Sequence, residues 1–182
     1  MKIVQTKFEG LLILEPAVYQ DDRGYFSEAY SYQRLKENGL DMRFIQDNQS
    51  FSRKGVIRGL HFQNAPKAQT KLVRVLQGVI LDIVVDLRRN QATYKMVHAI
   101  ELSKENRKQI MVPKGFAHGF SVLGETADIL YKCDEVYAPE CEGGIRFDDP
   151  ELKIDWMIDP EKRIVSSKDS ALPYLKNAQF HF

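Results

Sequence analysis

Two histidines stand in sequence contexts that could carry chemistry. His61 lies in RGLHFQ, three residues after Arg58, and His118 follows a proline and a glycine in VPKGFAHGF. Histidine can act as an acid or a base near neutral pH, or as a metal ligand. A histidine between two apolar residues, here Leu60 and Phe62, is more often a packed core residue. The stretch by itself therefore leaves three roles open for His61: core residue, metal ligand and base.

A lysine close to this stretch adds to the case for chemistry. Lys71 begins the apolar segment KLVRVLQGVILDIVVDLR. If the residues of this segment alternate as in a β-strand, Lys71 shares one face with Val73 and Val75. Burying an ammonium group without a partner is costly, so a lysine on an apolar face must be paired or functional. Lys71 is therefore a candidate for a functional site.

The spacing of Arg58 and His61 sets a condition on a shared site. Residues that are three apart in a regular strand point to opposite faces of the sheet. Both side chains can reach one pocket only if Gly59 marks a bulge or a bend. A site that uses both residues therefore requires an irregular strand at this glycine.

His118 belongs to a PxGxxH pattern that resembles the second sequence motif of the cupins, jelly-roll proteins that hold a ligand in the barrel mouth. Many cupins bind a metal ion through a His-x-His pair, a glutamate and the histidine of this second motif. RGLHFQ supplies only one histidine, with no His-x-His and no glutamate a few residues later. Because the ligand count falls short, we expect no metal site.

Other polar positions have ordinary structural explanations when each is taken alone. Tyr131 in LYKCDEVY is typical of a strand tyrosine with its hydroxyl at the rim. SSKD at 166–169 is typical of a solvated helix cap. QDN at 46–48 and DDRGYFSE at 21–28 have the composition of loops. None of these positions decides the function by itself.

Strand signals dominate the elements that must position these residues. The β-branched segment 71–88 is interrupted by Gly78, where a hairpin or a bulge would fit. Turn residues recur at short, regular intervals, which favours an all-β sandwich or barrel over alternating strands and helices. The other predicted strands are 11–19, 97–102, 107–112, 118–123 and 127–137.

One helix is expected near the N-terminus. Ser31 can cap it, YQRLKEN supplies its turns, and Gly39 can end it in the left-handed conformation. The tail from Asp155 onward contains two prolines and predicts short helices or turns packed over the sheet. Because no repeat or linker interrupts the sequence, we expect residues 1–182 to form a single domain.

Composition bears on the class of protein. The formal net charge of +1 gives no electrostatic case for binding to nucleic acid or to a membrane. The N-terminal MKIVQTKFEG has no apolar run suited to a signal peptide, and no segment approaches the ~20 apolar residues of a membrane span. Cys133 and Cys141 are too few for a disulfide framework. We therefore expect a cytoplasmic globular protein.

Taken together and in order, several blocks resemble the dTDP-4-dehydrorhamnose 3,5-epimerase family from about residue 5 to about residue 174. The blocks are FIQDNQSFSRKGVIRGLHFQ, QTKLVRVLQG, VDLR, VPKGFAHGF, LYKCDEVYAPECEGGIRFDDP and SSKD. The resemblance implies a cupin-like jelly roll with a few short peripheral helices. It also implies epimerisation of a thymidine-diphosphate-linked 4-keto-6-deoxyhexose. That reaction needs a base, an acid and a group that stabilises an enolate, without a metal or nicotinamide cofactor.

The resemblance also implies roles for individual residues. His61 matches the family's base, Asp169 the carboxylate that orients it, Tyr131 the acid, and Lys71 the group that stabilises the enolate oxygen. The other matched positions, which imply contacts with the sugar, the diphosphate or the nucleotide, are Arg58, His118, Glu142, Lys168, Gln46, Asp47 and Asn48.

A homodimer is a further implication of the resemblance. Arg23 and Glu28 match positions in an N-terminal segment that the family shares between subunits. The resemblance therefore implies that this N-terminal segment contributes to substrate binding in the neighbouring subunit.

Three alternatives remain at this point. A relative within the family could invert only C3 or only C5 of the sugar. A metal-dependent cupin could use His61 and His118 as ligands. A non-catalytic cupin could bind a sugar nucleotide, although it would have no need for a base and an acid together.

Overall fold

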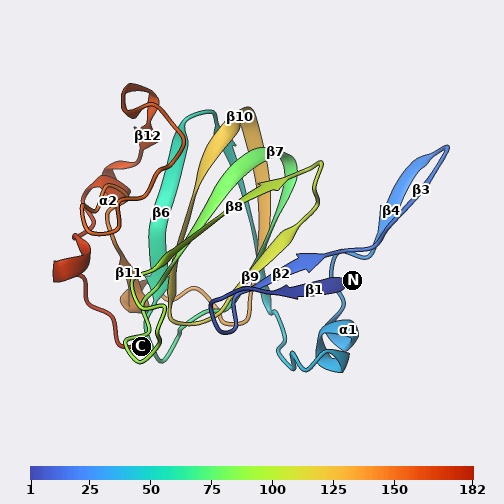
Figure 1. The fold of residues 1–182 in the computed structure, drawn as a ribbon, viewed down its shortest axis with the longest axis horizontal. Helices are drawn as coiled ribbons and strands as arrows, with labels where there is room; N and C mark the ends of the chain where they lie inside the picture. The colour runs from blue at the N-terminus through green and yellow to red at the C-terminus, as the bar shows by residue number, and fades with distance from the viewer.

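The computed structural model describes residues 1–182 as a curled β-sheet with a projecting hairpin and a few short helices (Figure 1). The strands are β1 (Lys2–Gln5), β2 (Leu12–Glu15), β3 (Val18–Asp21), β4 (Gly24–Ser27), β5 (Gln46–Arg53), β6 (Val56–Gln63), β7 (Lys71–Asp86), β8 (Val97–Ser103), β9 (Gln109–Val112), β10 (Phe116–Cys133), β11 (Glu142–Gly144) and β12 (Ile164–Val165). The helices are α1 (Tyr32–Glu37) and α2 (Ser167–Ser170), with 3₁₀ turns at Pro139–Cys141, Pro160–Lys162 and Leu175–Asn177. None of the helices has the length and apolar character that crossing a membrane would require.

Two long strands, β7 and β10, fold the sheet back on itself. They pair with each other along most of their length, while β7 also pairs with β9 near its start and with β8 near its end. In the same way, β10 pairs first with β6 and then with β5. Where the partners change, both long strands pass from one layer to the other. The result is the jelly-roll sandwich that the sequence predicted.

A bulge marks the point where β7 changes layers. The β7–β10 register shifts between Val122 and Ala127, and Ala127 lies opposite Gly78. Gly78 has a φ of +81°, and a Cβ there would lie 1.9 Å from the Thr126 carbonyl oxygen. Only glycine fits this close approach. The hairpin predicted as one possibility at Gly78 is absent; the ladder is irregular there instead, with its extra residues on β10, which takes five steps from Val122 to Ala127 against two on β7.

β6 contains the irregularity that a shared site for Arg58 and His61 requires. In the β6–β10 ladder, His118 pairs with His61, whereas Phe120 pairs with Arg58. Two steps along β10 match three along β6, so β6 carries one extra residue. Gly59 lies at this bulge with a φ of +122°, and a Cβ on it would lie 2.6 Å from a backbone carbon of β10. The bulge brings Arg58 and His61 onto one face.

Apolar clusters fix both layers of the sandwich. The largest cluster fills its interior and includes Val73 and Val75, next to Lys71 on the same face of β7, as strand alternation predicted. A second cluster packs the C-terminal segment against β6 and β7 around Leu60 and Trp156. In Figure 1 this segment lies beside β6, with α2 close to it. The packing fixes the position of α2 relative to β6.

The predicted helix is confirmed. The Ser31 hydroxyl accepts a hydrogen bond from the Arg34 backbone N–H at the start of α1, and Gly39 has a φ of +82° just beyond its end. The short C-terminal helices and turns are present as well. These local signals succeed because capping and left-handed glycines depend on only a few neighbouring residues.

Two predicted boundaries were wrong. The segments 118–123 and 127–137 belong largely to one continuous strand, β10, because the backbone passes through Gly124 with a register shift and without a turn. The segment 11–19 is divided between β2 and β3 on either side of Pro16, which has no N–H to donate to a ladder.

The two segments with loop-like composition are also strands. QDN at 46–48 opens β5, and DDRGYFSE at 21–28 contains the turn and second strand of the β3–β4 hairpin. Their polar residues are compatible with strands because one face of β5 lines a cavity and because the hairpin lies at the surface.

Candidate active site

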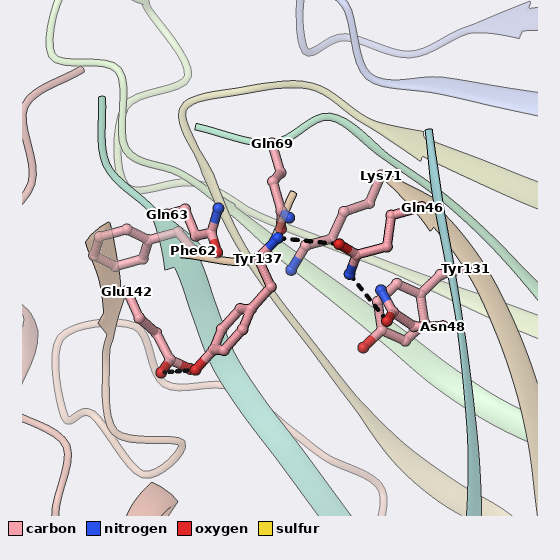
Figure 2. Close-up of a pocket in the computed structure, with 9 residues that line it drawn as sticks. All are labelled: Gln46, Asn48, Phe62, Gln63, Gln69, Lys71, Tyr131, Tyr137 and Glu142. Atoms are coloured by element: carbon pink, nitrogen blue, oxygen red, sulfur yellow. Dashed lines mark hydrogen bonds between the residues drawn. The ribbon is translucent and has the colours of Figure 1, made fainter. Parts of the chain in front are cut away.

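Two cavities share the lining residues Lys71 and Tyr131 and therefore adjoin each other. The outer cavity has a volume of about 300 Å³, and Figure 2 shows its lining. The deep cavity has a volume of about 90 Å³. The other residues of the outer cavity are Gln46, Asn48, Phe62, Gln63, Gln69, Tyr137 and Glu142. Those of the deep cavity are Ser50, Arg58, Val73, His118, Gly119, Phe120 and Ile129.

His61 lies on β6 next to residues of both cavities. Its cross-strand neighbour His118 lines the deep cavity, and Gln63, two residues further along the same face, lines the outer one. The His61 Nε2 atom lies 2.9 Å from Asp169 Oδ1 on α2. The His61 side chain keeps 30% of its surface exposed, whereas Asp169 keeps only 6%. His61 is therefore accessible to a ligand while its partner is sheltered from water.

Asp169 is held by several hydrogen bonds. Its Oδ2 atom accepts the Gly59 N–H at 3.0 Å, and its own N–H donates to Ser166 Oγ at 3.0 Å. Burial alone would raise the pKa of Asp169, but the hydrogen bonds from His61 and Gly59 outweigh it and keep this pKa below its ordinary value. Asp169 thus stays ionised and orients the imidazole of His61.

His118 forms a second histidine–aspartate pair next to the first. Its Nε2 atom lies 2.9 Å from Oδ2 of Asp82, a fully buried residue on β7. Since His118 and His61 are direct neighbours across β10 and β6, the two pairs lie side by side. Each histidine therefore has its own carboxylate. No group of three or more His, Cys, Asp or Glu side chains has the arrangement of a metal site.

Lys71 and Tyr131 lie where the two cavities meet. Burial lowers the pKa of the Lys71 ammonium, although nearby Cys133, Asp82 and Glu142 act in the opposite direction. Burial also raises the pKa of the Tyr131 hydroxyl. A lysine in this position can place a positive charge beside a developing oxyanion, and the phenol remains a neutral proton donor.

Arg58 reaches the deep cavity from β6. Its Nε atom donates to Ser52 Oγ at 3.0 Å, and a terminal nitrogen donates to the Phe51 carbonyl oxygen at 3.3 Å. Both acceptors lie on β5, so they fix the plane of the guanidinium group. A fixed guanidinium can bind two oxygens of a substrate group.

The outer cavity is polar and held together by hydrogen bonds (Figure 2). Gln46 donates to Asn48 Oδ1 at 3.1 Å and accepts the Tyr137 N–H at 3.1 Å. Glu142 accepts the Tyr137 hydroxyl at 2.9 Å and Lys168 Nζ at 2.7 Å. Although burial would raise the pKa of Glu142, the bonds from Lys168 and Tyr137 keep it below its ordinary value. The outer cavity is thus lined by amide groups, with the Lys168 ammonium bonded to one of its lining residues.

Three of the predicted site residues lie away from the cavities. Asp47 points from the opposite face of β5, where it binds Lys132 Nζ at 2.9 Å. Arg23 binds Asp21 in the turn of the β3–β4 hairpin, and Glu28 pairs with Arg34. In Figure 1 this hairpin projects away from the sandwich. The remaining predicted residues, His61, Tyr131, Asp169, Lys71, Gln46, Asn48, Arg58, His118, Glu142 and Lys168, gather at or beside the two cavities.

The sequence did not point to several lining residues. Gln69 and Gln63 carried a usable signal, since they are two residues before Lys71 and two after His61 and alternation puts them on the same faces. Tyr137 carried no such signal, because it lies in a loop that a distant residue positions. Gln63 accepts the Ala138 N–H and donates to the Val136 carbonyl, on either side of Tyr137. Such tertiary contacts leave no local pattern.

Known proteins resemble the chain over nearly its whole length. A family model for dTDP-4-dehydrorhamnose 3,5-epimerase matches residues 5–177. The dTDP-4-dehydrorhamnose 3,5-epimerase of Methanothermobacter thermautotrophicus is 48% identical over 169 residues, covering 92% of this chain and 91% of the relative.

Solved structures resemble it as closely. A dTDP-6-deoxy-D-glucose-3,5-epimerase of Legionella pneumophila, in complex with dTDP-4-keto-L-rhamnose, has a TM-score of 0.92 and 45% identity, covering 97% of this chain and 93% of that one. A double mutant of a 3'-monoepimerase from Streptomyces bikiniensis, in complex with dTDP, has a TM-score of 0.88 and 27% identity, covering 94% and 86%. The chain belongs to the dTDP-4-dehydrorhamnose 3,5-epimerase family.

Proposed function

We propose that this protein converts dTDP-4-dehydro-6-deoxy-D-glucose to dTDP-4-dehydro-L-rhamnose, an epimerisation at C3 and C5 in dTDP-L-rhamnose biosynthesis. The observation that carries the proposal is the His61–Asp169 pair, which lies next to His118 of the deep cavity, while Lys71 and Tyr131 line both cavities. The family match over residues 5–177 supplies the substrate class.

The reaction proceeds by proton removal beside the C4 ketone. His61 takes the proton from C3 or C5, and the electron pair of the broken C–H bond moves into the enolate. Lys71 stabilises the negative charge on the C4 oxygen, which lowers the barrier only if the cation is in place beforehand. Tyr131 then donates its proton to the carbon from the opposite face, which inverts the centre. Asp169 holds His61 in position and stabilises the imidazolium formed on the way.

The two cavities divide the substrate between them. The deep cavity is too small for a nucleotide and suits part of the hexose ring. Gln46 and Asn48 of the outer cavity offer amide groups to the nucleotide, and Lys168 at its edge offers a positive charge to the diphosphate. Lys71 and Tyr131 at the junction then lie next to the sugar.

A homodimer would complete this site. The β3–β4 hairpin pairs with no other strand of its own chain, and Tyr19 and Phe26 on it are 64% and 70% exposed. Exposed aromatic side chains on an isolated hairpin are a common mark of an interface. Arg23 and Glu28 on this segment would bind substrate in the partner subunit. The free thiols Cys133 and Cys141 suit a reducing compartment, and we place the enzyme in the cytoplasm.

Inversion of a single centre is the second candidate function. It is supported by the resemblance to a 3'-monoepimerase, at 27% sequence identity. The 3,5-epimerases are more similar, at 45% and 48% identity, and favour the double inversion.

A coupled assay tests the proposal. The purified protein should make the 4-keto substrate competent for reduction by a ketoreductase that accepts only dTDP-4-dehydro-L-rhamnose, with one NADPH oxidised per sugar. No NADPH oxidation with folded protein and active ketoreductase would contradict it.

A further inference from the structure

The inner face of β5 presents an unbroken series of polar side chains: Gln46, Asn48, Ser50 and Ser52. Gln46 and Asn48 are hydrogen-bonded to each other, and Ser52 accepts a hydrogen bond from Arg58. The Ser50 hydroxyl is different, because it is buried and has no hydrogen-bond partner. Of the four residues, Ser50 alone has no structural explanation for its polar side chain.

Ser50 lies in the deep cavity with the residues of the proposed reaction. Its companions there include Lys71, Tyr131, Arg58 and His118. Its cross-strand neighbour on β10 is the apolar Ile129, which offers no partner. A buried hydroxyl without a partner costs about 1–3 kcal/mol, so a sequence that retains one invites a functional explanation.

We propose that Ser50 is a specificity-determining residue whose hydroxyl hydrogen-bonds a ring hydroxyl of the hexose. This inference rests on the proposed function, which puts the hexose in the deep cavity. A serine hydroxyl can both donate and accept, as a sugar hydroxyl can, so the pair satisfies both groups. Among the other polar residues of the deep cavity, Arg58 and His118 already have partners on the protein, and Lys71 and Tyr131 serve the proposed reaction.

Binding of unreactive ligands tests the inference without depending on turnover. Calorimetry with dTDP-D-glucose should show an affinity about tenfold lower for Ser50→Ala than for the parent protein, the value of one hydrogen bond. dTDP alone should bind both proteins equally, because the nucleotide does not reach Ser50. With the 2-deoxy or the 3-deoxy analogue of dTDP-D-glucose, whichever lacks the bonded hydroxyl, the difference between the two proteins should disappear.

The ligand-free proteins give a second signature. Ser50→Ala removes an unpartnered buried hydroxyl, so its melting temperature should equal or exceed that of the parent. A purely structural serine would produce the opposite shift. Gln49→Ala is the matched control, because Gln49 lies on the exposed face of the same strand and bonds only to Asp128. It should leave the affinity for dTDP-D-glucose within twofold of the parent value, at the scale of a surface change.

The outcomes separate this inference from the proposed function. Equal affinity of Ser50→Ala and the parent for dTDP-D-glucose would overturn the role of Ser50. An equal loss with all three sugar ligands would do so as well, since the effect would not depend on a hydroxyl. Failure of the coupled assay, with the binding pattern intact, would instead overturn the epimerase reaction and leave the contact standing.

Discussion

Asp169 contacts both the proposed base and the backbone that positions it. One carboxylate oxygen binds His61 and the other binds the N–H of Gly59, at the bulge that turns His61 inward. A neutral asparagine of the same shape would keep the volume and lose the charge that stabilises an imidazolium. We expect Asp169→Asn to lower kcat by about two orders of magnitude or more, with little change in KM.

The same residue makes a prediction about pH and stability. The pKa of Asp169 is lower in the folded protein than in the unfolded chain, so its stabilising contribution is complete above the unfolded pKa of about 4. That contribution is lost as the pH falls through the folded pKa. The difference in melting temperature between the parent and Asp169→Asn should therefore be largest above about pH 5 and shrink toward pH 3. A difference that grows on acidification would contradict the assignment.

Spacing pointed to Lys71, whereas the roles of His61, Tyr131 and Asp169 were implied by the family resemblance. Lys71 and its apolar face followed from alternation along β7. Gln69 could have been found in the same way. Ser50 and Tyr137 could not, because a serine in a polar stretch and a tyrosine in a loop look alike whether or not they line a cavity.

At the scale of the element, the β6 bulge is what joins Arg58 to His61. We expect Gly59→Ala to destabilise the fold by about 3 kcal/mol or more, since its Cβ would overlap the backbone of β10 in a conformation that alanine rarely adopts. Activity should fall with it, because relief of the clash displaces His61. Denaturant unfolding and turnover measure the two effects.

Gly24→Ala is the matched control for this substitution. Gly24 has nearly the same backbone angle, with a φ of +124°, but nothing lies within 4 Å of the added Cβ. It should therefore cost only the conformational strain, about 1–2 kcal/mol. Equal losses for the two variants would show that close packing at the bulge is unimportant.

The success of the strand predictions varied with the environment of each strand. β7 was identified because its interior residues are apolar. β5 and β6 were not, since the inward residues of a strand that lines a polar cavity are themselves polar and erase the alternation. The requirement for a bulge at Gly59 followed from spacing alone and is confirmed by the register. The strands that line the candidate active site are therefore the ones whose sequence pattern is hardest to recognise.

At the scale of the whole molecule, a dimer would be built by the β3–β4 hairpin. If Arg23 serves the partner's site, a mixed dimer of Arg23→Ala and His61→Ala chains has one intact site. Co-expression of the two inactive variants should then recover about one quarter of the parent activity, because half of the dimers are mixed and each has one working site of two.

The control for this complementation uses two substitutions that each disable the site of their own chain. A mixture of His61→Ala and Tyr131→Phe chains leaves every site with one defect, so it should recover nothing. Recovery in the control, or none in the test mixture, would contradict sharing of the hairpin between subunits. The local pattern of residues 21–28 indicated only a loop, and the expectation that they serve a second copy came from the family resemblance.

Proton exchange at the two sugar carbons is the most direct test of the proposed function. The protein is incubated with dTDP-4-dehydro-6-deoxy-D-glucose in deuterated water, and the C3 and C5 protons are followed by NMR. We predict loss of both signals with the parent protein and retention of both with His61→Ala. Loss at only one carbon would contradict the double inversion and favour a single-centre epimerase. Retention of both signals with the folded parent protein would contradict proton abstraction at this site altogether.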